Sequence, residues 1–305
     1  MKLLLKGLML SGALAGLSSC EGNPLAYQED THGRGKQKIY LEESYKPLFE
    51  TSIYVFESQF PKADIIPEYC TQEEAIKALF EKKTNTICIA RDLTKEEKAS
   101  LKKASVEVRS TKMASDAVAL IVHPDNQDST LTIEQLKRIL RGNDSLWGTS
   151  KLPINVVFDH VNSANFQYLR DLTGKTPVPK NVFAVSSNEE VIKYVMEHPS
   201  AIGVIGVNWI SDSDDAAVVA FRAGVKLVSV ARNAGGEYFQ PYQAYIHTKE
   251  YPLTRDAWLI NKGSVGGLNT GFVNWMTGEH GQLLIQKSGL IPATAVVRLI
   301  ETSEQ

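Results

Sequence analysis

Hydrophobic and polar residues alternate along residues 38–292 in blocks that predict strands and helices in turn. Short apolar runs are typical of buried strands. They lie at Lys38–Leu41, Ala63–Ile66, Ile87–Ala90, Asp116–Val122, Ile154–Phe158, Ala201–Val207 and Asp256–Ile260. The segments between these runs have helical spacing. In the first of them, Tyr45–Phe60, the candidate inward positions are Leu48, Ile53, Phe56 and Phe60.

Polar residues mark where several helices begin. In Thr71–Glu74, Thr94–Glu97, Thr132–Gln135 and Ser187–Glu190, a hydroxyl residue stands three positions before Glu or Gln, which is the pattern of a capping box. Two more helices are predicted at Asn162–Leu172 and Phe272–Lys287. Because strands and helices alternate in two successive sets, the sequence predicts an α/β fold with mostly parallel sheets in two lobes.

The first twenty residues predict export and lipid anchoring. Lys2 and Lys6 are followed by an apolar stretch that is too short for a membrane span and ends in Leu17-Ser18-Ser19-Cys20. This tetrapeptide resembles the lipobox of bacterial lipoproteins, which implies that residues 1–19 are a signal peptide and that Cys20 is acylated. An ordinary signal peptide with an incidental cysteine is the alternative. Residues 20–37 are polar, with several glycines, and predict an anchor and flexible tether.

Composition limits the cellular location and the binding partners that the chain is expected to have. After removal of residues 1–19 the net charge is about −4, and no run of Lys and Arg is present, so nucleic acid is not expected as a partner. Glu21 after the anchor favours the outer membrane, at the periplasm or the cell surface. An exported compartment permits a disulfide between Cys70 and Cys88, but two free thiols are the favoured interpretation.

The order of motifs resembles the PstS-like phosphate-binding proteins of ABC importers. The stretches that carry this resemblance are Ile87–Thr94, Asp116–Asn126 with Leu131–Leu136, Pro199–Gly203, and Tyr251–Arg255 with Gly281–Pro292. The resemblance implies a type II periplasmic binding protein, in which two α/β lobes, each a mainly parallel sheet flanked by helices, are joined by crossing strands. One lobe is expected to hold residues 38–118 plus 251–305, and the other residues 119–250. The implied partners are a small polar solute, such as phosphate, and a transporter.

The resemblance also implies where a ligand would lie. Three loops correspond to the phosphate loops of the family, and their candidate ligand-binding residues are Ser44, Tyr45, Thr71, Asp159, Asn162, Ser163 and Asn165. Ser44 and Thr71 have the alternative role of capping the helices that follow them. Arg91 matches an arginine that faces the cleft, where it would pair either with an oxyanion or with Asp159 or a nearby Glu. His160 in the third loop is expected to be solvated.

Acidic residues set this chain apart from the family pattern. The same loops contain five acidic residues, Glu42, Glu43, Glu73, Glu74 and Asp159. A carboxylate next to a bound phosphate in a desolvated cleft weakens binding by on the order of several kcal/mol, because like charges repel. Two hypotheses follow. The chain is a solute receptor with an altered cleft, or an envelope protein that kept the scaffold, lost the ligand and binds a protein. No catalytic, metal-binding or cofactor motif stands out, so no enzyme activity is predicted.

Overall fold

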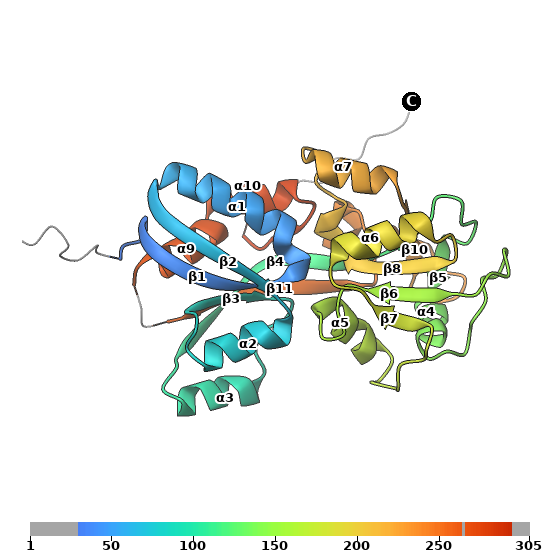
Figure 1. The fold of residues 1–305 in the computed structure, drawn as a ribbon, viewed down its shortest axis with the longest axis horizontal. Coiled ribbons are helices and arrows are strands. Elements are labelled where there is room, and N and C mark those ends of the chain that lie inside the picture. Colours follow the sequence, from blue (N-terminus) through green and yellow to red (C-terminus); the bar gives the residue numbers. More distant parts are fainter. Residues whose placement is uncertain (1–29, 264–265, 295–305) are drawn as a thin grey trace, which may run out of the picture.

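The computed structural model describes residues 30–263 and 266–294 of the chain. Cys20 and residues 21–29 of the predicted tether lie outside the described residues. The described chain forms two lobes, lobe I at the left of Figure 1 and lobe II at the right. No helix in the described ranges is long and apolar enough to cross a membrane.

Strands and helices alternate through both lobes. The strands are β1 (Arg34–Glu42), β2 (Lys62–Cys70), β3 (Thr86–Ile89), β4 (Val108–Val122), β5 (Thr130–Thr132), β6 (Asn155–Phe158), β7 (Val182–Ala184), β8 (Ala201–Gly206), β9 (Lys226–Leu227), β10 (Ser229–Ala231), β11 (Thr254–Lys262) and β12 (Ile291–Pro292). The helices are α1 (Lys46–Gln59), α2 (Gln72–Phe80), α3 (Lys95–Lys103), α4 (Ile133–Leu140), α5 (Ala164–Leu172), α6 (Asn188–Glu197), α7 (Ala216–Ala223), α8 (Gln243–His247), α9 (Leu268–Thr277) and α10 (Glu279–Lys287), with the short 3-10 helices η1 (Glu43–Tyr45) and η2 (Val207–Trp209).

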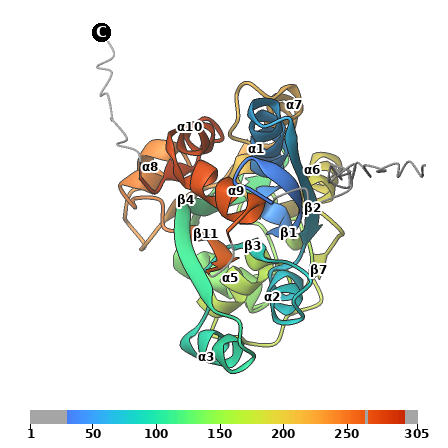
Figure 2. The ribbon, with the colours of Figure 1, turned by 90° about the vertical axis from the view of Figure 1, so that its left-hand side faces the viewer.

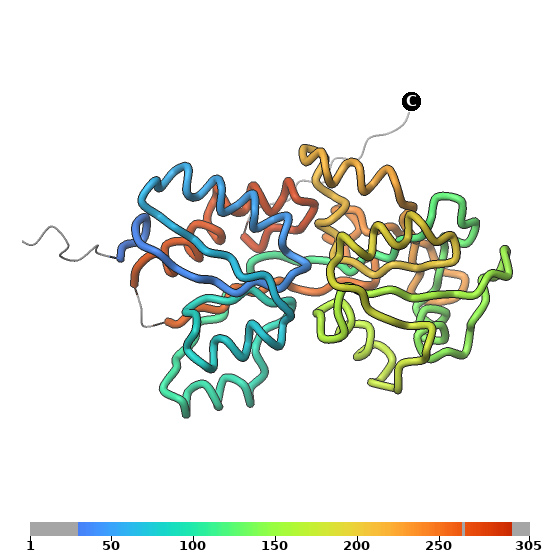
Figure 3. Tube along the Cα trace, viewed as in Figure 1, coloured from blue at the N-terminus to red at the C-terminus, as the bar shows by residue number. Residues whose placement is uncertain are grey.

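One strand is shared by the two lobes. The strand order is β2-β1-β3-β11-β4-β8-β6-β7, and β4 pairs with β11 through its first part and with β8 through its last part. The trace in Figure 3 follows the chain into lobe II along β4 and back to the junction, where β11 begins and leads into lobe I. Away from β4 and β11 the pairs are parallel: β1 with β2 and β3, and β6 with β7 and β8. Every pair that includes β4 or β11 is antiparallel. The predicted α/β fold of two lobes with mainly parallel sheets is therefore confirmed, whereas the exact lobe boundaries stay a prediction.

Helices cover both faces of the lobe I sheet. Figures 1 and 2 show α1, α9 and α10 on one side and α2 and α3 on the other. The capping boxes predicted from Thr71, Thr94 and Thr132 are all present, each with the side chain at the third helical position bonded back to the cap. Ser187 caps α6 through the amide of Glu190. Local sequence thus sets where these helices begin.

Several elements differ from the sequence prediction. β1 begins at Arg34, before the expected start at Lys38, because its polar first residues pair with β2 at a sheet edge. The polar first half of β4 was not predicted either, because apolar and polar residues alternate only weakly there. The single helix predicted over Phe272–Lys287 is wrong: α9 ends at Thr277, and Gly278 separates it from α10, which begins at Glu279. Phe60, predicted to face inward, follows the last residue of α1 and is 36% exposed.

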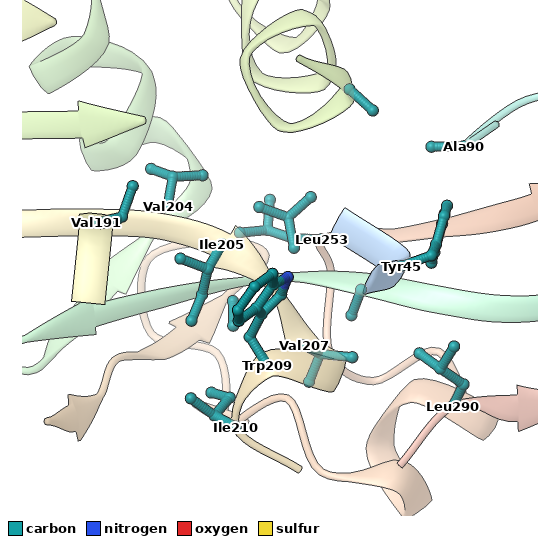
Figure 4. Packing of buried hydrophobic residues seen from close by; sticks show 14 of the residues in the cluster. Tyr45, Ala90, Val191, Val204, Ile205, Val207, Trp209, Ile210, Leu253 and Leu290 are labelled. Carbon is teal, nitrogen blue, oxygen red and sulfur yellow. The ribbon is translucent and has the colours of Figure 1, made fainter. Parts of the chain in front are cut away.

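A hydrophobic cluster runs through both lobes. Figure 4 shows part of it, with Tyr45 and Ala90 from lobe I and Val204, Ile205 and Trp209 from lobe II. All five side chains are buried. Because apolar contacts continue from one lobe into the other, this core supports the polar residues that lie between the lobes.

The two cysteines lie on either side of β1. Glu42 of β1 is paired with Cys70 of β2, and Leu41 with Cys88 of β3. Both thiols are free, Cys88 buried and Cys70 half-buried. The favoured interpretation of two free thiols is confirmed, although Cys70 is less buried than a core residue.

Gly271 tests how the first described residues pack on α9. A Cβ at Gly271 would lie 2.0 Å from the carbonyl oxygen of His32, which is backbone and cannot rotate away. We expect Gly271→Ala to lower the free energy of unfolding by about 1–3 kcal/mol, the usual range for overpacking, measured by urea denaturation. Gly266→Ala, with open space around the added Cβ, is the control and is expected to be near neutral. Equal stability of the two variants would contradict this packing.

Candidate functional site between the lobes

Carboxyl groups gather where lobe I meets lobe II. A cavity of about 170 Å³ lies at this junction, and its lining includes Glu42, Glu43, Glu74, Asp159 and His160. A larger hollow of about 380 Å³ lies at the far end of lobe II, lined by β5, α4 and the loop at 143–148. Its two carboxylates already have partners within lobe II. The junction between the lobes is therefore the better candidate site.

Glu42, the last residue of β1, reaches both lobes. One oxygen of its carboxyl group accepts a hydrogen bond of 3.0 Å from the Ser44 amide, at the start of η1. The other accepts one of 3.3 Å from the Ala164 amide, the first residue of α5 in lobe II. The residue is fully buried. Backbone amides at a helix start attract negative charge because of the helix dipole, so Glu42 holds a place suited to an anion.

Asn188 ties the second and third carboxyl groups together. Its side-chain amide nitrogen donates to Glu43 and, at 3.1 Å, to Asp159. Its side-chain oxygen accepts from Asn165 and from the Gly206 amide, each at 3.1 Å. Because Glu43 belongs to lobe I and the others to lobe II, these bonds also cross the junction.

Gly206 lets the lobes come close at this point. The Cβ of Ser44 lies 3.1 Å from where a Cβ on Gly206 would stand. A larger residue at position 206 would therefore push η1 away from β8. This close approach brings the Glu42 carboxyl group within reach of α5.

A buried ion pair supplies the positive charge. Arg255 of β11 donates from Nε to Asp116 of β4 at 2.8 Å, and the two side chains are 4% and 1% exposed. Nη1 and Nη2 of Arg255 are also buried, and neither has a hydrogen-bond partner among the described residues. The guanidinium lies over the Tyr45 ring, with 5.8 Å from Cζ to the ring centroid. The Ser44 and Tyr45 hydroxyls are likewise buried without a partner in the described part of the chain.

Burial dominates the protonation of the carboxyl groups. It raises the pKa of Glu42 to about 7, with Arg255 lowering that pKa and Asp159 raising it. Burial, with the nearby Asp159 and Glu42 charges, raises the pKa of Glu43 to about 8. Burial also raises the pKa of Asp159, although the Ser163 hydrogen bond opposes the rise. Near neutral pH these groups share protons and do not all carry full charge.

The structure brings most of the predicted site residues to this junction. Ser44, Tyr45, Asp159, Ser163 and Asn165 are all buried there. Ser163 donates to Asp159 at 2.6 Å and caps α5 through the Phe166 amide. Ser44 is not the side-chain cap of α1, since that helix begins without one. Its hydroxyl thus remains available for another partner.

The other predicted site residues have local partners. Thr71 is the cap of α2, as the alternative interpretation held, although it also lines the cavity. Arg91 forms a bidentate pair with Glu97, 2.8 Å for each bond, which fits its predicted alternative of a nearby Glu. Asn162 is exposed, and its backbone amide donates to Nδ1 of the His160 ring. In this structure Arg91 and Asn162 therefore do not face the cluster around Glu42.

Sequence reasoning missed three residues of the site. Arg255 and Asp116 stood in motifs that indicated the family, but neither was assigned to the site, and Asn188 was taken only as part of a helix start. A charged residue at the beginning of each of two long apolar strands was the available signal. The pairing of Asp116 with Arg255 depends on β4 and β11 lying side by side, which the sequence did not specify.

The donor set fits a small anion better than a metal. The described residues contain no group of His, Cys, Asp and Glu that would hold a metal ion. They do contain the unpartnered guanidinium nitrogens of Arg255, the unpartnered hydroxyls of Ser44 and Tyr45, and two backbone amides at helix starts that donate to Glu42. These groups donate hydrogen bonds and suit an oxyanion, while the neighbouring carboxyl groups suit a ligand that can carry protons.

Comparison with known proteins relates this chain to one superfamily of binding proteins. Residues 28–280 match the model of the PBP superfamily domain. The phosphate-binding protein PstS of Borreliella burgdorferi is 25% identical over 228 residues, 71% of this chain and 75% of that protein. PstS of Pseudomonas aeruginosa is 23% identical over 205 residues, and the match spans only 60% of its length and 61% of this chain.

Solved structures share the fold. A Clostridium perfringens structure with bound phosphate, named for a phosphate ABC transporter substrate-binding protein, has a TM-score of 0.72 at 23% identity and covers 85% of this chain and all of its own. An ABC-type phosphate transport receptor from Vibrio cholerae has a TM-score of 0.65 at 20% identity, over 84% of this chain and 99% of that one. At such identities the likeness shows the fold alone.

The pKa of Glu43 predicts how stability depends on pH. Its pKa is about 8 in the folded protein, against an ordinary value of 4.5. The folded protein therefore holds a proton that the unfolded chain releases, and stability falls as pH rises from about 4.5 to about 8. We expect Glu43→Gln, which cannot ionise, to unfold several degrees higher than the wild type at pH 8, roughly 2–4 °C for each kcal/mol, and at a similar temperature at pH 5.

Calorimetry from pH 5 to pH 9 checks this expectation. Glu50→Gln, at an exposed carboxylate of α1, is the control and should keep the wild-type dependence on pH. An unchanged slope in Glu43→Gln would show that Glu43 is not the group that titrates.

Proposed function

Because this chain belongs to the PBP superfamily as a PstS-like member, we propose that it is an extracytoplasmic solute-binding lipoprotein that holds a small oxyanion between its lobes and delivers it to an ABC importer. Inorganic phosphate is the first candidate ligand. The observation that carries this proposal is the set of unpartnered buried donors at the junction, above all Nη1 and Nη2 of Arg255. A guanidinium with two free nitrogens matches the oxygens of a phosphate.

Other donors lie at the same junction. The Ser44 hydroxyl has no partner among the described residues, and the amides of Ser44 and Ala164 start helices in opposite lobes. An oxyanion held by both amides would link lobe I to lobe II. Binding would then favour the closed arrangement, as expected for lobes that move about the two chain segments that join them.

The relatives support the same class of ligand. PstS of Borreliella burgdorferi is named a phosphate-binding protein, and the similar Vibrio cholerae structure a phosphate transport receptor. The hypothesis of an envelope protein that lost its ligand is not favoured, because these relatives bind phosphate by name and the junction keeps free donors. The lipid anchor at Cys20 rests on the motif Leu17–Cys20, outside the described residues.

Titration calorimetry with phosphate tests the ligand. We expect the wild type to bind phosphate and the double variant Asp116→Asn/Arg255→Gln to bind at least about tenfold more weakly, a loss of about 1.4 kcal/mol. The double variant removes both charges of the buried pair and leaves an amide in place of each, so neither member of the pair stays behind as an unpaired charge. Circular dichroism of the double variant is used to check that it folds.

Arg141→Gln is the matched control for this experiment. Arg141 is exposed, and it donates to the Thr173 carbonyl in lobe II. Its loss should leave phosphate affinity within about twofold, well under the tenfold step of 1.4 kcal/mol. The phosphate proposal fails if the wild type gives neither heat nor a rise in melting temperature with millimolar phosphate.

Metabolic labelling with a fatty acid tests the anchor. We expect the full chain, expressed in a bacterium that processes lipoproteins, to take up label and to fractionate with membranes. Cys20→Ser should lose both properties, because the acyl chains supply the membrane affinity. Cys70→Ser is the control and should label like the wild type. Labelling that persists in Cys20→Ser would contradict the assignment.

A further inference from the structure

The Glu42 side chain stands where the amides of both lobes converge. Its two carboxyl oxygens accept from the Ser44 amide at 3.0 Å and from the Ala164 amide at 3.3 Å. Ser44 belongs to lobe I and Ala164 to lobe II. A single buried side chain therefore links the two lobes through bonds of the kind that an oxyanion would accept.

We infer that Glu42 is a tethered anion which occupies the oxyanion position between the lobes, so that the protein closes on its own carboxyl group and an external oxyanion binds only by displacing it. This inference rests on the proposed function for the identity of the external ligand. It adds that the affinity for this ligand is set by competition within the chain.

The donors around Glu42 show that it is an incomplete substitute for an oxyanion. A carboxyl group has two oxygens, and both are used by the two amides. Nη1 and Nη2 of Arg255 and the Ser44 hydroxyl remain buried without partners among the described residues. A tetrahedral oxyanion has four oxygens and so offers acceptors both for the amides and for the guanidinium, whose charge already acts on Glu42. An exchange of Glu42 for such a ligand therefore gains hydrogen bonds.

The charges that face Glu42 come from every neighbouring element. Arg255 of β11 lowers the pKa of Glu42, whereas Asp159, in the loop after β6, raises it. Glu43 of η1 and Cys70 of β2 each have a pKa raised in part by the Glu42 charge, and so do Cys88 of β3 and Tyr45. Asp116 of β4 is paired with Arg255. The arriving anion thus meets one cation and several carboxyl groups.

Tethering gives Glu42 an advantage over a free ligand. A group on the same chain competes at an effective concentration that is commonly in the millimolar range or above. The measured affinity of the external ligand is its intrinsic affinity multiplied by the fraction of molecules in which Glu42 has left the site. Removal of the Glu42 charge should therefore strengthen ligand binding, whereas removal of an acid outside the site should not.

Phosphate titration of Glu42→Gln measures this competition. Glutamine keeps the shape and one acceptor oxygen but has no charge. At pH 8 we expect Glu42→Gln to bind inorganic phosphate at least about tenfold more tightly than the wild type. At pH 6, below the pKa of about 7 for Glu42, the difference should shrink because the wild-type group is then mostly neutral.

Glu73→Gln is the matched control. Glu73 also reaches across the lobes, since it accepts a 2.6 Å hydrogen bond from Gln167 of α5, but that contact is exposed. The affinity of the Glu73→Gln protein for phosphate should stay within about twofold of the wild type, because Glu73 does not compete for the two amides. Equal affinities of the wild type and Glu42→Gln, with phosphate bound by both, would overturn the inference and leave the proposed function standing.

Small-angle X-ray scattering in phosphate-free buffer gives a second, ligand-independent readout. Glu42→Ala removes the bond to the Ala164 amide that links the lobes, and we expect a larger radius of gyration than in the wild type, while Glu73→Ala stays unchanged. If Glu42→Ala opens the lobes but no variant binds phosphate, the tethered anion is supported and the phosphate ligand is rejected. If Glu42→Ala keeps the wild-type radius, the closure by Glu42 is refuted.

Discussion

Asp116 and Arg255 face each other on β4 and β11, near the point where β4 passes from lobe I into lobe II. Two charges in an apolar interior are stable only as a pair, and removal of one partner commonly costs about 3–5 kcal/mol. This pair fixes where the Arg255 guanidinium lies at the junction. Its electrostatic influence reaches Glu42 and Asp159, so the protonation of the whole cluster depends on it.

The carboxyl groups at the junction do not disturb the fold, because each has a local donor. Glu42 accepts from two amides, Asp159 from Ser163 and Asn188, and Glu43 from Asn188. Hydrogen bonds of this kind offset part of the penalty for burial. A family scaffold can therefore carry an unusual set of acids in its loops while its strands and helices keep their order.

Much of the fold could be predicted from the sequence, because local signals determine it. The threonine caps at Thr71, Thr94 and Thr132 and the buried runs of β3 and β8 depend on neighbouring residues alone. The first half of β4 could not be predicted, because its polar residues are made into a strand by β11.

Some residues of the candidate site could be predicted from local sequence, and others depend on tertiary contacts. Ser163 was predicted because it stands in a loop that resembles a phosphate loop of the family, and in the structure it caps α5. Arg255 and Asn188 were missed, since their roles arise from contacts between segments far apart in the chain. The role of Glu42 was foreseen only as repulsion. Its bond to Ala164 depends on the close approach of Ser44 to Gly206, a tertiary feature that no local pattern reveals.

The position of β1 between Cys70 and Cys88 has a consequence for how the chain folds. The two thiols are separated by two strand spacings of roughly 4.8 Å each, whereas a disulfide needs Cα atoms within roughly 7 Å. The folded protein thus forbids a bridge that the unfolded chain can form. In an oxidising compartment, β1 must enter the sheet before the thiols meet, and the order of assembly, rather than the final stability, then decides how much chain reaches the native state.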